Sequence, residues 1–74
     1  MDYKAAAREV LREVGHPLHY TDITKIALDS GYFESVGLTP QNTMRARLSV
    51  DVRDNPDTPF VHTAPGVYGL KDGL

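Results

Sequence analysis

Apolar residues near the start of the chain recur every three or four positions, which is the spacing of one face of a helix. Charged residues fill most of the positions between them. Asp2 precedes the pattern as a helix N-cap, and Gly15 follows it as the residue that most readily takes the left-handed conformation at a helix end. The pattern predicts a helix over Tyr3–Val14. Its buried face is expected to carry Tyr3, Ala6, Ala7, Val10, Leu11 and Val14.

Two further helices are predicted, each with a threonine in the N-cap position. Thr21 precedes a helix over Asp22–Ser30, which Gly31 ends. Thr39 precedes a third helix that starts at Pro40, because proline is favoured at the first helical position, and that runs to about Arg53. The inner faces of the two helices are expected to carry Ile23, Ile26 and Ala27, and Met44, Leu48 and Val52.

Three short segments are predicted to be strands. Leu18–Tyr20 follows a proline that keeps the chain extended, and Phe60–Thr63 and Val67–Leu70 flank the turn residues Ala64-Pro65-Gly66. The order of elements predicts an α+β, mainly α fold: a winged helix-turn-helix with three helices and a small antiparallel β-sheet whose hairpin is the wing. This architecture commonly holds one helix in the major groove of DNA, although a fold alone does not establish a function.

Length and composition exclude several classes of protein. A chain of 74 residues makes one domain, and the absence of cysteine excludes disulfides, thiol catalysis and cysteine-ligated metals. No apolar run is long enough to span a membrane, and the charged start does not fit a signal peptide. We therefore expect a cytoplasmic location, associated with the nucleoid if the protein is bacterial. We also expect residues 1–74 to be the N-terminal part of a longer protein.

The charge of the chain is unusual for a nucleic-acid binder. The net charge is −2, whereas affinity for DNA comes largely from neutralising phosphates. The distribution is more favourable, because residues 39–53 hold three arginines against one aspartate, a local charge of +2. Any binding to DNA should therefore be strongly sensitive to salt.

The predicted third helix carries the candidate DNA-reading residues. Thr39, Gln41, Asn42 and Arg45 lie at its N-terminal end, where recognition helices meet base edges. Asparagine and glutamine suit adenine, and arginine suits guanine. The alternative is that Thr39 only caps the helix, while Gln41 and Asn42 are ordinary polar residues of its first turn.

Further candidates for DNA contact lie along the third helix and in the hairpin. Arg47 and Arg53 suit phosphates, but each can instead form a surface ion pair with Asp51 or Asp54. The hairpin has no lysine or arginine before its end, which weakens the usual role of a wing in the minor groove. The remaining candidates are Ser49, His62 and Lys71.

No catalytic residue, metal site or cofactor is predicted. The serines lie in no nucleophile-elbow context, and no glycine-rich phosphate loop occurs. His16 and His19 are a conceivable metal pair, but a third ligand from His62 would have to be brought in by the fold. No small-molecule substrate and no membrane are expected as partners.

The chain resembles the HARE-type helix-turn-helix domain over nearly its whole length. The residues that carry this resemblance are Val10-Leu11, Gly15-His16-Pro17-Leu18-His19-Tyr20, Ile23 with Ile26, Gly37-Leu38-Thr39-Pro40 with Thr43, Leu48 with Asp51-Val52, Phe60, and Gly66-Val67-Tyr68-Gly69-Leu70. The family usually has a bulky aromatic residue in the first helix, a place that Tyr3 takes here.

The resemblance implies a winged-helix fold and DNA binding. The family includes restriction-endonuclease modules, additional-sex-combs-like chromatin proteins and the N-terminal domain of the bacterial RNA polymerase delta subunit. Some members have been proposed to sense modified cytosine.

The sequence thus indicates a non-catalytic module that binds double-stranded DNA, as the specificity or targeting domain of a bacterial restriction nuclease or of a transcription or chromatin-type regulator. A fused nuclease or other effector domain is then expected. The alternative is a protein-interaction module that docks on RNA polymerase or another partner domain. Exposure of Tyr32, Phe33 and Val36 in the turn before the third helix would favour this alternative.

Overall fold

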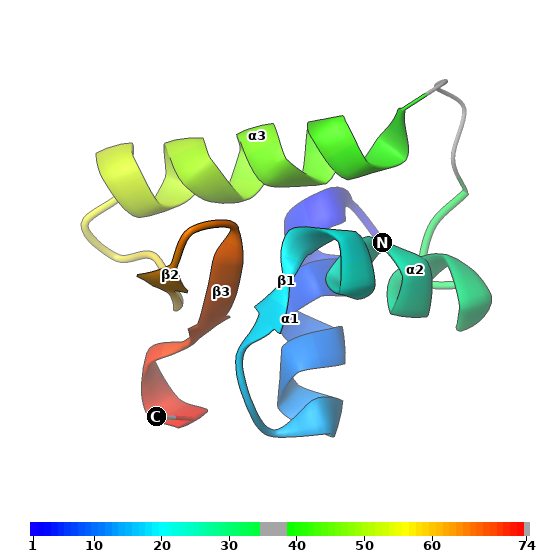
Figure 1. The fold of residues 1–74 in the computed structure, drawn as a ribbon, viewed down its shortest axis with the longest axis horizontal. Helices are drawn as coiled ribbons and strands as arrows, with labels where there is room; N and C mark the ends of the chain where they lie inside the picture. Colours follow the sequence, from blue (N-terminus) through cyan, green and yellow to red (C-terminus); the bar gives the residue numbers. More distant parts are fainter. Residues whose placement is uncertain (35–38, 74) are drawn as a thin grey trace.

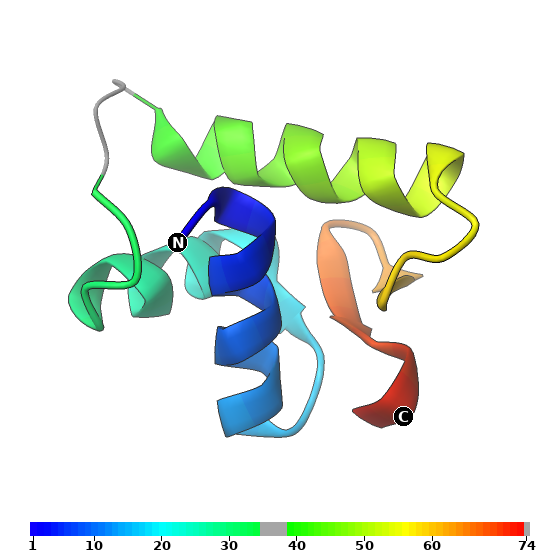
Figure 2. The same cartoon turned by 180° about the vertical axis from the view of Figure 1, so that it is seen from behind.

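The structure, a computed structural model, describes residues 1–34 and 39–73. Within these ranges the chain forms three α-helices, a small sheet and a terminal 3-10 helix (Figure 1). Helix α3 lies across one end of the molecule, α1 and α2 lie beneath it, and the hairpin stands beside α1, as the view from behind also shows (Figure 2). This arrangement confirms the predicted winged helix-turn-helix. The elements are α1 (Tyr3–Val14), β1 (Leu18–His19), α2 (Tyr20–Asp29), α3 (Pro40–Asp54), β2 (Phe60–Ala64), β3 (Val67–Leu70) and η1 (Lys71–Gly73).

Both predicted ends of α1 are confirmed. The Asp2 carboxylate accepts a hydrogen bond from the Ala5 backbone N–H at 2.7 Å, which satisfies one of the free donors at the start of the helix. Gly15 ends the helix with a φ of 83° and donates its N–H to the Leu11 carbonyl. The helix boundaries therefore follow from local chemistry.

The start of α2 differs from the prediction. The helix begins at Tyr20, so Tyr20 is helical and Thr21 is not the N-cap. His19 is the N-cap, and its Nδ1 accepts a hydrogen bond from the Thr21 backbone N–H at 3.3 Å. An imidazole nitrogen here takes the role that a hydroxyl or carboxylate oxygen usually has, while the Thr21 hydroxyl lies 2.8 Å from the same nitrogen.

The end of α2 follows the prediction closely. The helix ends at Asp29, and Gly31 follows the C-cap with a φ of 73°. Gly31 donates its N–H to the Leu28 carbonyl, and Tyr32 donates to the Ala27 carbonyl. This pair of bonds is a Schellman motif, which satisfies carbonyls at the end of the helix.

The third helix has the predicted start, with Pro40 as its first residue and Thr39 as its N-cap. The Thr39 hydroxyl makes no capping hydrogen bond, contrary to expectation. The Thr39 backbone carbonyl instead accepts from the N–H groups of Asn42 and Thr43. The turn that was predicted before this helix lies partly outside the described residues, at positions 35–38.

The core forms where the three helices meet the sheet. The predicted inner faces are confirmed, with Tyr3, Val14, Ile26 and Val52 packing at its margin. Tyr32 and Phe33 are half-buried against this core, so they do not provide the exposed apolar surface that would favour a protein partner, and Val36 lies outside the described residues. The buried apolar residues are Ala6, Ala7, Val10, Leu11, Ile23, Ala27, Met44, Leu48, Phe60 and Tyr68.

The sheet has three antiparallel strands in the order β1-β3-β2, which confirms the prediction. Leu18 lies opposite Tyr68, and Phe60 lies opposite Leu70. The register shifts between His62 and Ala64, where β2 bulges near the turn. The middle strand therefore connects the hairpin to the segment that leads into α2.

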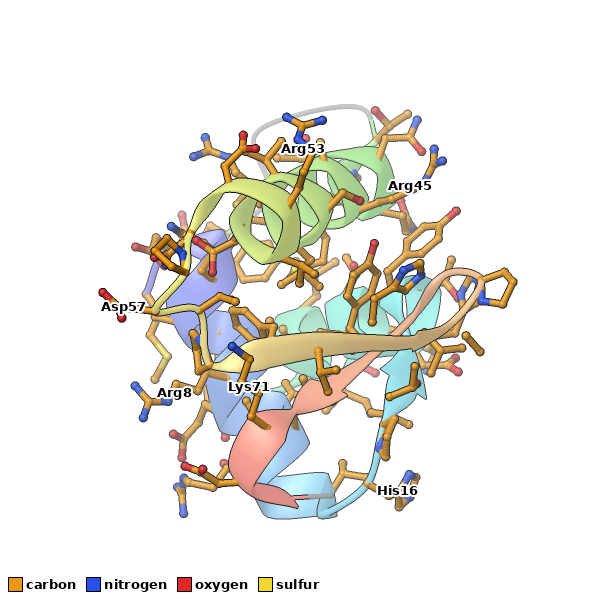
Figure 3. All side chains as sticks on the ribbon, turned by 90° about the vertical axis from the view of Figure 1, so that its left-hand side faces the viewer. Arg8, His16, Arg45, Arg53, Asp57 and Lys71 are labelled. Carbon is orange, nitrogen blue, oxygen red and sulfur yellow. The ribbon has the colours of Figure 1, made fainter. Side chains whose placement is uncertain are left out.

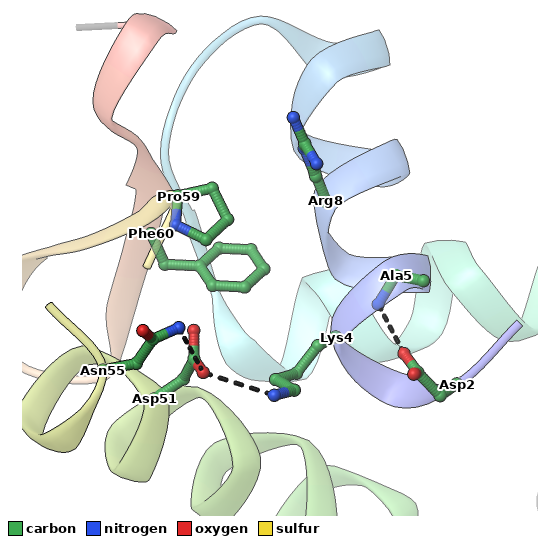
Figure 4. Close-up of a pocket in the computed structure, with 8 residues that line it drawn as sticks. All are labelled: Asp2, Lys4, Ala5, Arg8, Asp51, Asn55, Pro59 and Phe60. Carbon is green, nitrogen blue, oxygen red and sulfur yellow. Dashed lines mark hydrogen bonds and ion pairs between the residues drawn. The ribbon is translucent and has the colours of Figure 1, made fainter. Parts of the chain in front are cut away.

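A buried carboxylate joins α1, α3 and the start of β2. Asp51 is only 7% exposed, and its oxygens accept hydrogen bonds from Lys4 Nζ at 3.2 Å, Asn55 Nδ2 at 3.3 Å and Thr58 Oγ1 at 2.6 Å. Figure 4 shows the first two of these contacts. The Thr58 hydroxyl also accepts from the Phe60 N–H, which carries the connection into β2. The hydrogen bond from Thr58, together with those from Lys4 and Asn55, outweighs burial and lowers the pKa of Asp51.

Candidate nucleic-acid interface

One side of α3 presents polar side chains toward solvent. Asn42, Arg45, Ser49 and Arg53 follow one another at steps of three or four residues, so they share a side of the helix. Asn42, Arg45 and Arg53 are exposed, and Ser49 is half-buried. Exposed Thr39 and Gln41 lie at the N-terminal end of the same helix.

The Arg45 guanidinium lies over an aromatic ring from another helix. Its carbon atom is 6.0 Å from the centroid of the Tyr20 ring, in the first turn of α2. This distance is the outer limit of a cation–π interaction. No carboxylate within the described residues pairs with Arg45, so its charge is available to a ligand.

The hairpin contacts the same side of α3 through Tyr68, on which His62 stacks. The hydroxyl oxygens of Ser49 and Tyr68 lie 2.8 Å apart. The His62 ring stacks on the Tyr68 ring with 4.9 Å between their centroids. Ser49 therefore faces the hairpin, and His62 is exposed beside Tyr68, the residue that contacts Ser49.

The hairpin turn is also attached to the start of α2. The Tyr20 N–H donates to the Gly66 carbonyl at 2.9 Å. Gly66 has a φ of 73°, and a Cβ atom there would lie 2.6 Å from His19 Nε2, so this position requires glycine. We call the surface built from these elements the α3–wing face. It comprises Tyr20, Asn42, Arg45, Ser49, Arg53 and His62.

Arg53 is engaged with a neighbouring carboxylate at the C-terminal end of α3. Its Nε and an Nη atom donate to the two oxygens of Asp54 at 2.9 and 3.0 Å. This hydrogen bonding lowers the pKa of Asp54 and raises the pKa of Arg53. The surface pair that was an alternative for Arg53 is therefore present. A phosphate would have to displace or share this exposed pair.

Two sequence-predicted candidates lie away from the α3–wing face. Arg47 borders a hollow with Lys4 and Val50, on the side of α3 that faces α1, and Asp51 pairs with Lys4 rather than with Arg47. Lys71 begins η1 beyond the sheet, and its N–H donates to the Pro59 carbonyl. Figure 3 shows Arg45 and Arg53 on α3, and Lys71 on the far side of the hairpin from that helix.

The structure adds Tyr20 to the candidate surface. The sequence placed this residue in a strand, where its contact with Arg45 was not foreseeable. The shift of the helix start by two residues turns the Tyr20 ring toward α3. The alternation of apolar and polar residues at 18–20 predicted a strand there, and so gave no indication of this contact.

Within the described residues, no group of three histidine, aspartate or glutamate side chains is placed to hold a metal ion. His16 contacts the Pro17 carbonyl through Nδ1, whereas His19 contacts Thr21, so these two residues serve local structure. In the same part of the chain, no helix has the length and apolar character needed to cross a membrane.

The model of the HARE-HTH family, whose description names ASXL proteins and a restriction endonuclease HTH domain, matches residues 1–72. No curated protein and no solved structure matches the chain.

Proposed function

Because the chain belongs to the HARE-HTH family of DNA-binding, non-catalytic helix-turn-helix domains, we propose that it binds duplex DNA through the α3–wing face. The N-terminal half of α3 enters the major groove, and the hairpin lies against the adjacent backbone. The observation that carries this assignment is the position of Arg45. Its guanidinium has no carboxylate partner within the described residues, and it lies over the ring of Tyr20, the residue to which the hairpin turn is hydrogen-bonded.

The residues of the face have distinct proposed roles. Asn42 and Arg45 contact base edges, since an amide suits adenine and a guanidinium suits guanine. Gln41 and Thr39 lie where the helix start approaches the backbone. Arg53 and His62 contact phosphates, and Ser49 positions the hairpin through Tyr68. Arg47 and Lys71 have no role in this face.

The proposed biological role is targeting. A domain with a net charge of −2 and few basic side chains on its binding face should bind weakly alone. Fusion to a nuclease or a transcription regulator would supply further contacts and raise the effective affinity. We therefore propose that the domain directs such a fused activity to DNA, with modified cytosine as a candidate determinant.

The test compares two arginines on opposite sides of one helix. Labelled duplexes are titrated with the wild-type chain, Arg45→Ala and Arg47→Ala, at low and moderate salt, and binding is followed by fluorescence anisotropy. Both variants lose one positive charge from α3. Loss of a base contact should weaken binding by about 1–3 kcal/mol in Arg45→Ala, whereas Arg47→Ala should change it little.

The Asn42→Ala/Arg45→Ala variant extends this test, and we expect it to abolish salt-sensitive binding. A duplex with modified cytosine, titrated in parallel, tests the proposed determinant. Equal losses in Arg45→Ala and Arg47→Ala would contradict the assigned face. Absence of binding at low salt would contradict DNA binding by this domain altogether.

A further inference from the structure

The side of the molecule formed by α1 and the back of α3 carries three adjoining hollows. Their volumes are about 230, 340 and 510 Å³. Lys4 and Asp51 border the first and second, and Ala5 and Arg8 border the first and third, so the hollows form one continuous surface. Figure 4 shows the first, in which Lys4 reaches Asp51 and Arg8 lies further along α1. We call this surface the α1–α3 band.

The band holds the most exposed apolar side chains of the described chain. The two large hydrophobic residues that stand exposed within residues 1–34 and 39–73 are Met1, at 63%, and Val50, at 46%. Met1 borders the third hollow and Val50 the second. Ala5 and Ala46 extend the apolar surface between them. Apolar groups gathered along hollows are typical of a surface that another molecule covers.

The uncompensated charge of the band is positive. Asp2 caps α1, Asp51 accepts three hydrogen bonds, and Glu9 pairs with Arg12, so these carboxylates are already engaged. Arg8 and Arg47 border the band, and neither makes an ion pair within the described residues. A ligand on this surface therefore meets apolar contacts flanked by two available guanidinium groups.

We propose that the α1–α3 band docks an acidic, amphipathic segment of a partner protein. Carboxylates of the segment pair with Arg8 and Arg47, and its apolar side chains cover Val50 and Met1. Duplex DNA fits less well because it has no apolar edge to cover these side chains. A second copy of the chain fits less well because its own arginines would face those of the first.

The band and the α3–wing face lie on different sides of the molecule. Figure 3 shows Arg8 on the α1 side and Arg45 on the opposite side. A partner on the band therefore leaves the DNA-binding face open, and the proposed docking does not depend on the proposed DNA contact.

The test uses a synthetic amphipathic peptide as the probe, with leucines at helical spacing and glutamates at the other positions. It is titrated into the isotope-labelled chain, and backbone amide shifts are followed by NMR. We expect the shifts to concentrate at Ala5, Arg8, Ala46 and Val50, with little change at Tyr20 and His62. A peptide whose leucines are replaced by serines should bind more weakly. The original peptide should likewise bind more weakly to the Val50→Ser variant.

Matched charge reversals separate the band from overall charge. Arg8→Glu/Arg47→Glu and the control Lys25→Glu/Arg45→Glu each reverse two basic residues, one of them on α3. Loss of two surface pairs should weaken peptide binding about tenfold in the first variant only. Circular dichroism establishes that both variants are folded.

Three results would overturn the proposal. One is absence of any shift at the band. Another is equal weakening of peptide binding by the two double variants. The third is loss of duplex binding in Arg8→Glu/Arg47→Glu with peptide binding unchanged, which would make the band the DNA-binding surface.

Discussion

The hydroxyl oxygens of Ser49 and Tyr68 lie 2.8 Å apart, so a single hydrogen bond joins the exposed side of α3 to the middle strand of the sheet. Tyr68 is buried, and its ring supports the exposed ring of His62. This contact therefore adds a polar connection to the apolar packing of α3 against the hairpin in the core. Because both elements belong to the α3–wing face, the contact has consequences for stability and for the shape of that face.

Replacing Tyr68 with phenylalanine keeps the buried ring and removes the hydroxyl. We expect Tyr68→Phe to lower the free energy of unfolding by about 1 kcal/mol, the typical net value of a hydrogen bond. Urea denaturation measures this change. Ser49→Ala removes the other partner, so the double variant should lose little more than either single variant. Strictly additive losses would show that the two hydroxyls do not interact.

Replacing Asp51 with asparagine removes a charge from the junction of α1, α3 and β2. Hydrogen bonds to charged groups contribute more than neutral ones, and the amide cannot accept from all three donors. We expect Asp51→Asn to lower the free energy of unfolding by about 2–3 kcal/mol. Asp57→Asn is the control, because Asp57 is exposed and should change stability by less than about 0.5 kcal/mol. Similar losses in the two variants would contradict the assigned role of Asp51.

The same carboxylate predicts how stability depends on pH. The pKa of Asp51 is lower in the folded chain than in the unfolded chain, where it is about 3.9. The carboxylate therefore stabilises the fold fully at pH values above the pKa of the unfolded chain. The effect is lost as the pH falls through the lower, folded-state pKa. Urea unfolding, measured from neutral pH downward, gives the free energies of unfolding of the wild type and Asp51→Asn. The difference between the two should stay constant at first and disappear in acid. A gap that persists at the acid end would contradict this linkage.

Two glycines with the same positive φ angle provide a matched pair. Gly66 and Gly31 both have a φ of 73°, but a Cβ atom would meet His19 only at Gly66. His19 cannot move away easily, because its ring caps α2 and packs on Tyr20. Gly31→Ala should cost about 1 kcal/mol for the backbone conformation alone. Gly66→Ala should cost at least about 1 kcal/mol more, and thermal denaturation of both variants measures the difference.

An equal loss in the two alanine variants would show that His19 yields to the added methyl group. In that case the N-cap of α2 would not depend on the hairpin turn. The backbone amide shift of Thr21 reports on the cap directly, and it should change in Gly66→Ala and remain unchanged in Gly31→Ala.

Features that depend on a few neighbouring residues were predictable from the sequence. Asp2 and Gly15 act on donors and acceptors within four positions, and both ends of α1 were predicted correctly. Pro40 likewise marked the start of α3. The three strands were predicted because proline and glycine interrupt the chain where the strands begin and turn.

Features that depend on distant contacts were not predictable. Burial of Asp51 requires Lys4, which lies 47 positions away, and helical spacing alone gives no reason to expect a charge among Met44 and Leu48. The predicted N-cap of α2 was wrong. By residue type Thr21 is the better capping residue, but strand pairing places His19 in the capping position.

The candidate site was predictable in part for a similar reason. Residues two positions apart on a helix do not share a side, so the side chains of Arg45 and Arg47 are expected on different sides of α3. Which of them lies beside the hairpin depends on how α3 packs on the sheet. That relation appears only in three dimensions, through Ser49 and Tyr68.

The bulge in β2 bears on how the molecule behaves at high concentration. β2 is an edge strand, and edge strands invite backbone pairing with other molecules, which leads to aggregation. Here Pro59 and Pro65 flank the strand, and the irregular register at His62 and Ala64 twists it away from a regular ladder. These features protect the hairpin from growing into an intermolecular sheet.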